Sequence, residues 1–372
     1  MDRRKFVTAA GVAGAAGLLS ACGKQPTSQT DCPGASSAET FEWKMVTSWP
    51  RDFPGLGTGA NRLAENITRL SNGRLKVKVY GGNELVPPFE VFDAVSQGTA
   101  EMGHSAAYYW KGKTAAAQFF AGIPFGLSAQ EFHGWIYYGG GLELWREVYA
   151  PFDLIPFLAG SSGPQMAGWF NLEINSLDDL KGLKMRIPGL GGEILKRAGG
   201  TPVTIPVAEL FTALQTGIID ATEWVGPYND LTIGLFRAAK YYYYPGWHEP
   251  GTGLECMVSR DAWESLPEDL QAVVEVACQA VVTDMLSDFN SHNGIALKQL
   301  VEQHGVQLRR LPDEVLIHLR EIGHELMRDL AAKDELFGRI YESFTAYYET
   351  VSPWTAISER SLLNLRPDPF AG

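Results

Sequence analysis

Residues 209–224 read ELFTALQTGIIDATEW, and MRIPG stands before them at 185–189. The segment 206–217 is predicted to form a helix, because its apolar residues recur at helical spacing. Pro206 suits the first turn of this helix and Gly217 suits its end. A helix bounded in this way indicates one repeat of an α/β fold.

The residues after this helix are predicted to form a strand over 218–224. The strand would carry Glu223 and Trp224 to its carboxyl end, which is the edge where open α/β sheets bind ligands. Arg186, at the end of an earlier predicted strand, would reach the same edge. Arg186 and Glu223 are therefore expected to face one cleft.

Length and composition describe a soluble protein with two lobes. The chain has 372 residues, more than a usual single domain. Hydrophobic residues make up 45% and charged residues 20%, which is typical of a globular protein with a sizeable core. The formal net charge is −12, and the sequence shows no basic stripe. We therefore expect no nucleic-acid partner.

The N-terminus has the pattern of an export signal. Residues 2–7, DRRKFV, form a twin-arginine motif, and an uncharged run follows it. The run ends in LSACG, which resembles a lipobox with Cys22 as the lipidated residue. Residues 1–22 are therefore predicted to be a twin-arginine lipoprotein signal, and the polar residues 23–40 a tether. The expected location is the periplasm, with a membrane anchor at Cys22.

Strands and helices alternate from residue 41 onward, which predicts a parallel-rich α/β lobe. The predicted strands are 41–48, 75–80 and 100–105, and the predicted helices are 59–70 and 88–96. A second α/β set is predicted from strands at 163–170 and 183–187 and a helix at 191–198. The aromatic strand 240–245 is expected to return the chain to the first lobe.

The expected fold is therefore α/β, with two lobes joined by hinge crossovers and a long helical C-terminal tail. Lobe I is expected over 41–160 and about 246–265, and lobe II over 161–245. Residues from about 266 to 372 are predicted to be all-helical, with a break at Pro312, and to brace the lobes or form a dimer contact. We expect no segment after the leader to cross a bilayer.

Three cysteines remain beyond Cys22. A Cys256–Cys278 bridge is conceivable in an oxidising compartment, but two buried free thiols are the preferred interpretation. Cys32 lies in the tether. No Cys or His spacing indicates zinc.

The ordered motifs, with LKMRIPG at 183–189 foremost, resemble the extracytoplasmic solute-binding subunits of tripartite ATP-independent periplasmic (TRAP) transporters. The resemblance spans nearly the whole mature chain and implies a periplasmic-binding-protein-like fold. It also implies that Arg186 grips a substrate carboxylate, which a guanidinium can do through two parallel hydrogen bonds. Replacing Arg186 with Ala is expected to abolish acid binding and leave the fold intact, because a cleft arginine is not core.

The nearest branch resembles binding subunits for 2-oxo and 2-hydroxy monocarboxylates, which hold the acid through a cation. The resemblance implies that the cation ligands are the side chains of Gln165, Glu223 and Glu249 and the main-chain oxygen of Trp224, with Gln165 also near the substrate. These ligands are all oxygens, which suits Na⁺ or Ca²⁺ rather than zinc or copper. His248, beside Glu249, is a weak argument for a transition metal.

Charge counting supports a cation in this implied site. Two glutamates and one monocarboxylate carry −3, and Arg186 returns +1, which leaves −3 + 1 = −2. Burying unpaired charge is costly. Na⁺ reduces the surplus to −1 and Ca²⁺ cancels it, whereas the resemblance favours Na⁺. We take Na⁺ as the expected ion and Ca²⁺ as the alternative.

The resemblance also places Tyr108 and Tyr109 at the substrate pocket, although core packing is an equal alternative for either. The expected function is to deliver a small organic acid to the membrane permease subunits of a TRAP transporter, without catalysis and with the protein as a homodimer. A periplasmic sensor for organic acids is the alternative. An exported enzyme acting on 2-oxo acids is the less favoured one, because no base suggests itself beyond the metal ligands.

Overall fold

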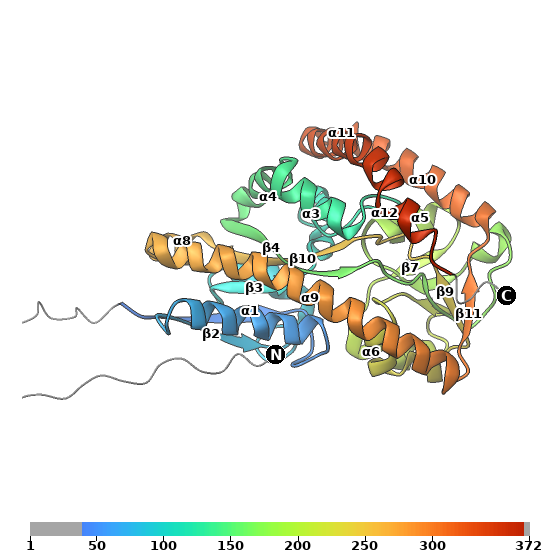
Figure 1. Ribbon diagram of the computed structural model, residues 1–372, viewed down its shortest axis with the longest axis horizontal. Helices are drawn as coiled ribbons and strands as arrows, with labels where there is room; N and C mark the ends of the chain where they lie inside the picture. Colours follow the sequence, from blue (N-terminus) through green and yellow to red (C-terminus); the bar gives the residue numbers. More distant parts are fainter. Residues whose placement is uncertain (1–38, 368–372) are drawn as a thin grey trace, which may run out of the picture. The chain divides into compact units, whose positions relative to one another are not determined.

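The computed structural model describes residues 39–367. The expected signal at 1–22, with Cys22, and nearly all of the 23–40 tether lie outside the described residues. Within them the chain forms two β-sheets, each with its own helices, and a C-terminal group of long helices (Figure 1). The predicted two-lobed α/β organisation is therefore present.

The first sheet has five strands in the order β2-β1-β3-β10-β4. β1, β2 and β3 run parallel, whereas β10 runs antiparallel to both of its neighbours. The strands are β1 (Phe41–Thr47), β2 (Leu75–Tyr80), β3 (Met102–Ser105), β4 (Leu154–Gly163) and β10 (Thr252–Ser259).

The helices of the first lobe are α1 (Leu56–Leu70), α2 (Val91–Ser96), α3 (Ala129–Tyr138), α4 (Gly141–Tyr149) and α8 (Arg260–Ser265). Leu63 and Ile67 of α1 are fully buried, as their helical spacing predicts. Short 3-10 helices lie at Pro88–Glu90, Ala107–Trp110, Ala115–Phe120 and Ala150–Phe152. The second of them follows β3 directly and carries Tyr108 and Tyr109 at the edge of the sheet.

The second sheet has six strands in the order β11-β9-β5-β8-β6-β7. Only β5 (Gly168–Phe170) runs antiparallel to both of its neighbours, β8 (Ala221–Thr222) and β9 (Tyr241–Tyr244). The remaining strands of this lobe are β6 (Lys184–Arg186) and β7 (Thr201–Val203). Its helices are α5 (Gly189–Arg197), α6 (Val207–Gln215) and α7 (Pro227–Ile233), with 3-10 helices at Leu177–Leu180 and Leu235–Arg237.

The longest helix, α9 (Glu268–Glu302), contacts α1 and β4 of the first lobe and α7 of the second. Figure 1 shows it running beside elements of both sheets. Contrary to the sequence expectation, α9 is long and apolar enough to span a membrane by length and composition alone. Ten residues of α9, among them Met285 and Phe289, are buried in the protein core, whereas Val276 and Ile295 are exposed.

The C-terminal part is not all-helical as predicted. β11 (Gln307–Arg310) joins the edge of the second sheet, parallel to β9. The sequence QLRR has a single apolar residue, so hydrophobic periodicity gave no signal for this strand. The helices that follow are α10 (Asp313–Ala331), α11 (Glu335–Ile357) and α12 (Glu359–Leu363).

The chain crosses from the first sheet to the second over residues 164–167 and returns over 245–251. The two crossovers are hydrogen-bonded to each other: Gln165 N donates to the Glu249 carbonyl at 3.2 Å, and Gly246 N donates to the Gln165 carbonyl at 3.1 Å. A Cβ at Gly246 would overlap that Gln165 carbonyl, so this close approach requires glycine. The crossovers therefore form one double connection, and it carries Gln165 and Glu249.

Three strand predictions differ from the structure. The strand predicted over 163–170 is interrupted, because the crossover separates Gly163 of β4 from Gly168 of β5. The strand predicted over 218–224 pairs only at Ala221 and Thr222, and Ile218 is 67% exposed. The aromatic strand β9 belongs to the second sheet, and the return to the first lobe follows it.

Cys256 of β10 and Cys278 of α9 are free and buried. This agrees with the preferred interpretation of two free thiols over a bridge. Burial raises the pKa of the Cys256 thiol well above its usual value, which favours the protonated thiol.

Candidate functional site

Glu249 of the second crossover is 4% exposed and lies in a compact hydrogen-bond network. Gln165 Nε2 and Thr252 Oγ1 both donate to Glu249 Oε2, each at 2.7 Å. Gln165 Nε2 also donates to Thr252 Oγ1 at 3.1 Å. With its nitrogen held in this way, Gln165 keeps Oε1 buried and without a hydrogen-bond partner in the described part of the chain.

Glu223 follows β8 and pairs with Arg186 at the end of the neighbouring strand β6. Arg186 Nη1 donates to Glu223 Oε1, and both side chains are only 1% exposed. The sequence correctly predicts that these residues meet. However, the Arg186 side chain is buried, which differs from the expectation that it lies outside the core. Its removal would leave the Glu223 carboxylate buried and unpaired.

Aromatic residues surround the Arg186 guanidinium. The Trp224 ring centroid lies 4.9 Å from the guanidinium carbon, and the Tyr109 hydroxyl accepts a hydrogen bond from Nη2 at 3.3 Å. The Tyr108 ring packs edge-on against Tyr109 with 4.8 Å between centroids. The structure thus places Tyr109 in contact with the arginine and Tyr108 one ring further away, while Trp224 presents its indole ring to the site.

His248 precedes Glu249 and is 3% exposed. Its Nε2 lies 3.4 Å from Glu223 Oε2, and neither ring nitrogen has a hydrogen-bond partner among residues 39–367. One ligand atom each from Glu223, His248 and Glu249 lies within 4.8 Å of the other two. The three side chains therefore surround one small space.

Burial dominates the electrostatics of this space. It raises the pKa of Glu249 to about 7, with a further contribution from Glu223. Burial alone would lower the pKa of Arg186, but Glu223 and the two tyrosines outweigh it, so the guanidinium stays charged. The Arg186–Glu223 pair is neutral as a unit, which leaves Glu249 as the unbalanced acid.

The donor set suits a hard cation. Gln165 Oε1 and Glu223 Oε2 are buried acceptors without hydrogen-bond partners in the described chain. The Glu249 carboxylate accepts a hydrogen bond from Gln165, and one of its oxygens lies within 4.8 Å of an oxygen of Glu223. Carboxylate and amide oxygens are the ligands of Na⁺- and Ca²⁺-type sites. A bound cation would satisfy both acceptors and stabilise ionised Glu249. The residues therefore fit the cation that the sequence led us to expect.

Gln165, Glu223, His248, Glu249 and Thr252 form a cage around this space, and sequence reasoning missed two of its members. Thr252 opens β10 and carries no motif, so only the fold reveals that it holds Glu249 and Gln165. His248 was set aside because no second histidine stands at metal-ligand spacing. The signal that could have found it is its position next to Glu249 in the turn WHEP.

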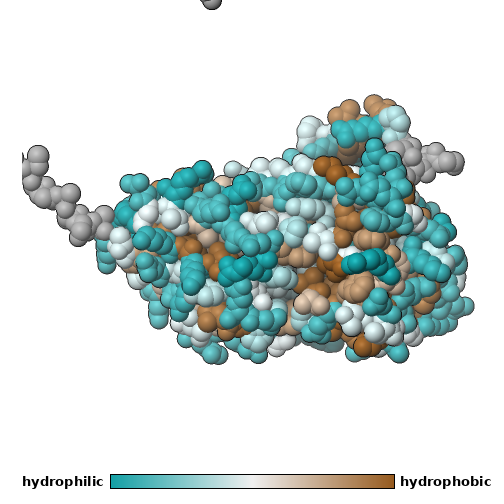
Figure 2. All heavy atoms as spheres, turned by 90° about the horizontal axis from the view of Figure 1, so that it is seen from below, coloured by the Kyte–Doolittle hydropathy of each residue, from teal (hydrophilic) through white to brown (hydrophobic). Residues whose placement is uncertain are grey.

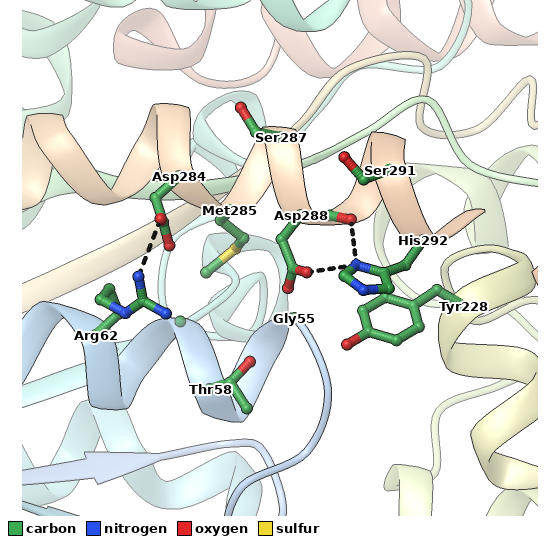
Figure 3. Close-up of a pocket in the computed structure, with 11 residues that line it drawn as sticks. Gly55, Thr58, Arg62, Tyr228, Asp284, Met285, Ser287, Asp288, Ser291 and His292 are labelled. Atoms are coloured by element: carbon green, nitrogen blue, oxygen red, sulfur yellow. Dashed lines mark hydrogen bonds and ion pairs between the residues drawn. The ribbon is translucent and has the colours of Figure 1, made fainter. Parts of the chain in front are cut away.

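A polar groove of about 380 Å³ lies between α1, α7 and α9, and none of the cage residues lines it. Figure 3 shows Arg62 of α1 directed at Asp284 of α9, with 3.2 Å between Nη1 and Oδ1. It also shows His292 between Asp288 and Tyr228; the His292 and Tyr228 rings stack with 4.6 Å between centroids. These contacts tie α9 to one helix of each lobe.

The model for bacterial extracellular solute-binding proteins of family 7 matches residues 45–334. The chain belongs to this family. A monocarboxylate 2-oxoacid-binding periplasmic protein of Nostoc sp. is 40% identical to this family 7 protein over 364 residues, which is 98% of each chain.

Solved structures of TRAP periplasmic solute-binding proteins share the fold, each with a TM-score of 0.86 and 88% of this chain covered. The protein of Pseudoalteromonas atlantica, 42% identical and fully covered, contains sodium and pyruvate. That of Colwellia psychrerythraea, 43% identical and 99% covered, contains calcium and pyruvate. That of Bordetella bronchiseptica, 37% identical and 97% covered, is a dimer with calcium and picolinate.

These comparisons confirm two sequence predictions. The family 7 protein is related to TRAP solute-binding subunits, as its motifs indicated. Its two-lobed fold with a long C-terminal helix is the TRAP solute-binding fold. Members of the family bind solutes for transport and act as receptors.

Proposed function

We propose that this protein is the periplasmic receptor of a TRAP transporter and captures a 2-oxo or 2-hydroxy monocarboxylate, such as pyruvate, together with a cation. The observation that carries the proposal is the buried cage, in which Gln165, Glu223 and Glu249 converge beside Arg186. Relatives that contain pyruvate together with sodium or calcium support it.

In this proposal Gln165, Glu223 and Glu249 of the cage, together with Trp224 and Arg186, have distinct roles. The oxygens of Gln165, Glu223 and Glu249 would hold the cation, with the Trp224 main-chain oxygen as a further ligand. A 2-oxo acid can chelate that ion through one carboxylate oxygen and its neighbouring oxygen. The Arg186 guanidinium would hold the carboxylate through Nη2, which at present makes only a 3.3 Å hydrogen bond to Tyr109.

Charge distinguishes the two candidate ions. Glu223 and Glu249 with one acid and Arg186 leave −3 + 1 = −2, so Ca²⁺ neutralises the site and Na⁺ leaves −1. One pyruvate-containing relative holds sodium and another holds calcium, so both ions stay in the proposal. Na⁺ remains the expected ion and Ca²⁺ the alternative. Pyruvate affinity measured against free Na⁺ and then against free Ca²⁺ separates the two, because the resident ion is the one that acts at physiological concentration.

Isothermal titration calorimetry tests the substrate class. Pyruvate should bind to chelator-treated protein only after Na⁺ or Ca²⁺ is restored, and a longer 2-oxo acid should report the space available to its tail. Propionate, which lacks the 2-oxygen, is the matched control and should bind at least about tenfold more weakly, a difference of about 1.4 kcal/mol. Equal affinity for propionate and pyruvate would contradict chelation of the ion.

The partners and location follow from the same proposal. The receptor would deliver its acid to two membrane permease subunits, after export by the twin-arginine signal and anchoring through Cys22. Metabolic labelling with a palmitate analogue tests the anchor: the full-length chain should be labelled, and its Cys22→Ala variant should not. A label that persists in this variant would exclude Cys22 as the modified residue.

The protein is also proposed to be a homodimer through α11 and α12. Hydrophobic residues are exposed on a surface that is otherwise largely hydrophilic (Figure 2), and five of them cluster near the end of the described chain: Trp354, Ile357, Leu362, Leu363 and Leu365. The Bordetella relative is a dimer. A second copy of the chain would remove these residues from water.

Sedimentation velocity tests this contact. The variant Trp354→Glu with Leu362→Glu should sediment as a monomer where the wild type is a dimer. The control is Ile218→Glu, because Ile218 is equally exposed, at 67%, but belongs to the second lobe. If both variants sediment as the wild type does, the dimer contact lies elsewhere.

A further inference from the structure

His248 belongs to the cage, and the proposed function does not use it. It is 3% exposed, and both ring nitrogens lack a hydrogen-bond partner within residues 39–367. A buried polar group without a partner costs about 1–3 kcal/mol, so such a group calls for an explanation. The imidazole is adjacent to the space that Glu223 and Glu249 share.

Na⁺ and Ca²⁺ take oxygen ligands and make no use of an imidazole nitrogen. Imidazole nitrogens with carboxylates instead suit zinc, nickel and copper. The three side chains would provide one nitrogen and two carboxylates, which leaves a fourth position open, as in zinc sites with three protein ligands. The same cage therefore offers one donor set to hard ions and another to borderline ones.

The spacing of the donors agrees with a zinc ion. Two ligands about 2.1 Å from a tetrahedral ion lie about 3.4 Å apart. His248 Nε2 and Glu223 Oε2 are 3.4 Å apart, and an atom of Glu249 completes a group in which all separations are within 4.8 Å.

Charge does not distinguish zinc from calcium here. With Glu223, Glu249 and Arg186, either divalent ion gives −2 + 1 + 2 = +1, which one monocarboxylate brings to zero. The neutral imidazole adds no charge to this sum. The nitrogen of His248 is thus the feature that selects between the two divalent ions.

We propose that the cage can bind two classes of cation. Zn²⁺ or a similar borderline ion binds to His248, Glu223 and Glu249 and competes there with the hard ion of the proposed function. The competition rests on the proposed function, whereas zinc binding itself does not. Zinc would then occupy the receptor in place of Na⁺ or Ca²⁺ and block or alter capture of the acid.

The test is calorimetry of chelator-treated protein with Zn²⁺ alone. The wild type should bind one equivalent, and His248→Gln should bind it at least about 30-fold more weakly. The matched control is His292→Gln, because His292 is an exposed histidine paired with Asp288 at 2.7 Å, where zinc could bind adventitiously. This control should keep the wild-type affinity. Equal zinc affinity of the wild type and His248→Gln would overturn the proposal.

A spectroscopic measurement on the wild type keeps the proposal testable if His248→Gln does not fold. Cu²⁺ bound at one equivalent should show nitrogen coupling from one imidazole by pulsed electron paramagnetic resonance, and added Zn²⁺ should remove the signal. A spectrum without nitrogen coupling would overturn the site. Pyruvate binding with Ca²⁺ that persists when zinc does not bind would reject this inference and leave the proposed function standing.

Discussion

Replacing Arg186 with Met tests how the site is built. The substitution keeps much of the side-chain volume but removes the charge that pairs with Glu223, and both side chains are 1% exposed. Breaking a buried ion pair by removing one partner costs about 3–5 kcal/mol, because the other charge stays buried. The variant also lacks the hydrogen bond to Tyr109 and the contact of the guanidinium with the Trp224 ring. We expect the free energy of unfolding to fall by about 4 kcal/mol.

The assay is urea unfolding at pH 7.5 in cation-free buffer, on a double-mutant cycle. The variants are Arg186→Met, Glu223→Gln and the two combined. The double variant should lose at least about 2 kcal/mol less than the sum of the single losses, because no unpaired charge remains. Arg339→Met is the control, since its ion pair with Glu147 is about half exposed and should contribute under about 1 kcal/mol. A loss under about 1 kcal/mol for Arg186→Met, or additive losses, would refute the reasoning.

Three further predictions concern the crossovers and the core. Glu249→Gln should weaken cation and pyruvate binding together, at least about tenfold each in calorimetry, and an unchanged pyruvate affinity would remove the ion from the site. Gly246→Ala should lower the unfolding midpoint and abolish pyruvate binding, because a Cβ would push the Gln165 carbonyl away; a wild-type melting curve would contradict this. Burial raises the pKa of Glu255 to about 7, so the folded state binds more protons than the unfolded state between about pH 4.5 and 7, and stability should fall by up to about 3 kcal/mol as pH rises through that range. Glu255→Gln should flatten that slope in a pH series of thermal melts, and an equal slope in both proteins would contradict the assignment.

Much of the fold could be predicted because local patterns agree with it. The apolar spacing of α1 and the alternation in β1 and β2 predict elements within a few residues of the observed ones. Short elements were less accessible. β8 has two residues and β11 one apolar residue, so their pairing comes from the neighbouring strands rather than from their own sequence.

The site was predicted from motifs more than from periodicity. Arg186 and Glu223 lie at the ends of adjacent parallel strands, so the α/β pattern alone predicts that they meet. The meeting of Gln165 and Glu249 depends on the two crossovers, which are 84 residues apart in the chain and leave no periodic signal. The burial of Arg186 was missed because a motif reports which residues meet but not what covers them.

The central claim is that cation and acid share one site. Thermodynamic linkage makes this measurable, because each ligand must change the affinity of the other by the same factor. We therefore expect calorimetry to show that a saturating cation tightens pyruvate binding at least about tenfold, and that saturating pyruvate tightens cation binding by the same factor. Affinities of cation and pyruvate that do not depend on each other would contradict the account.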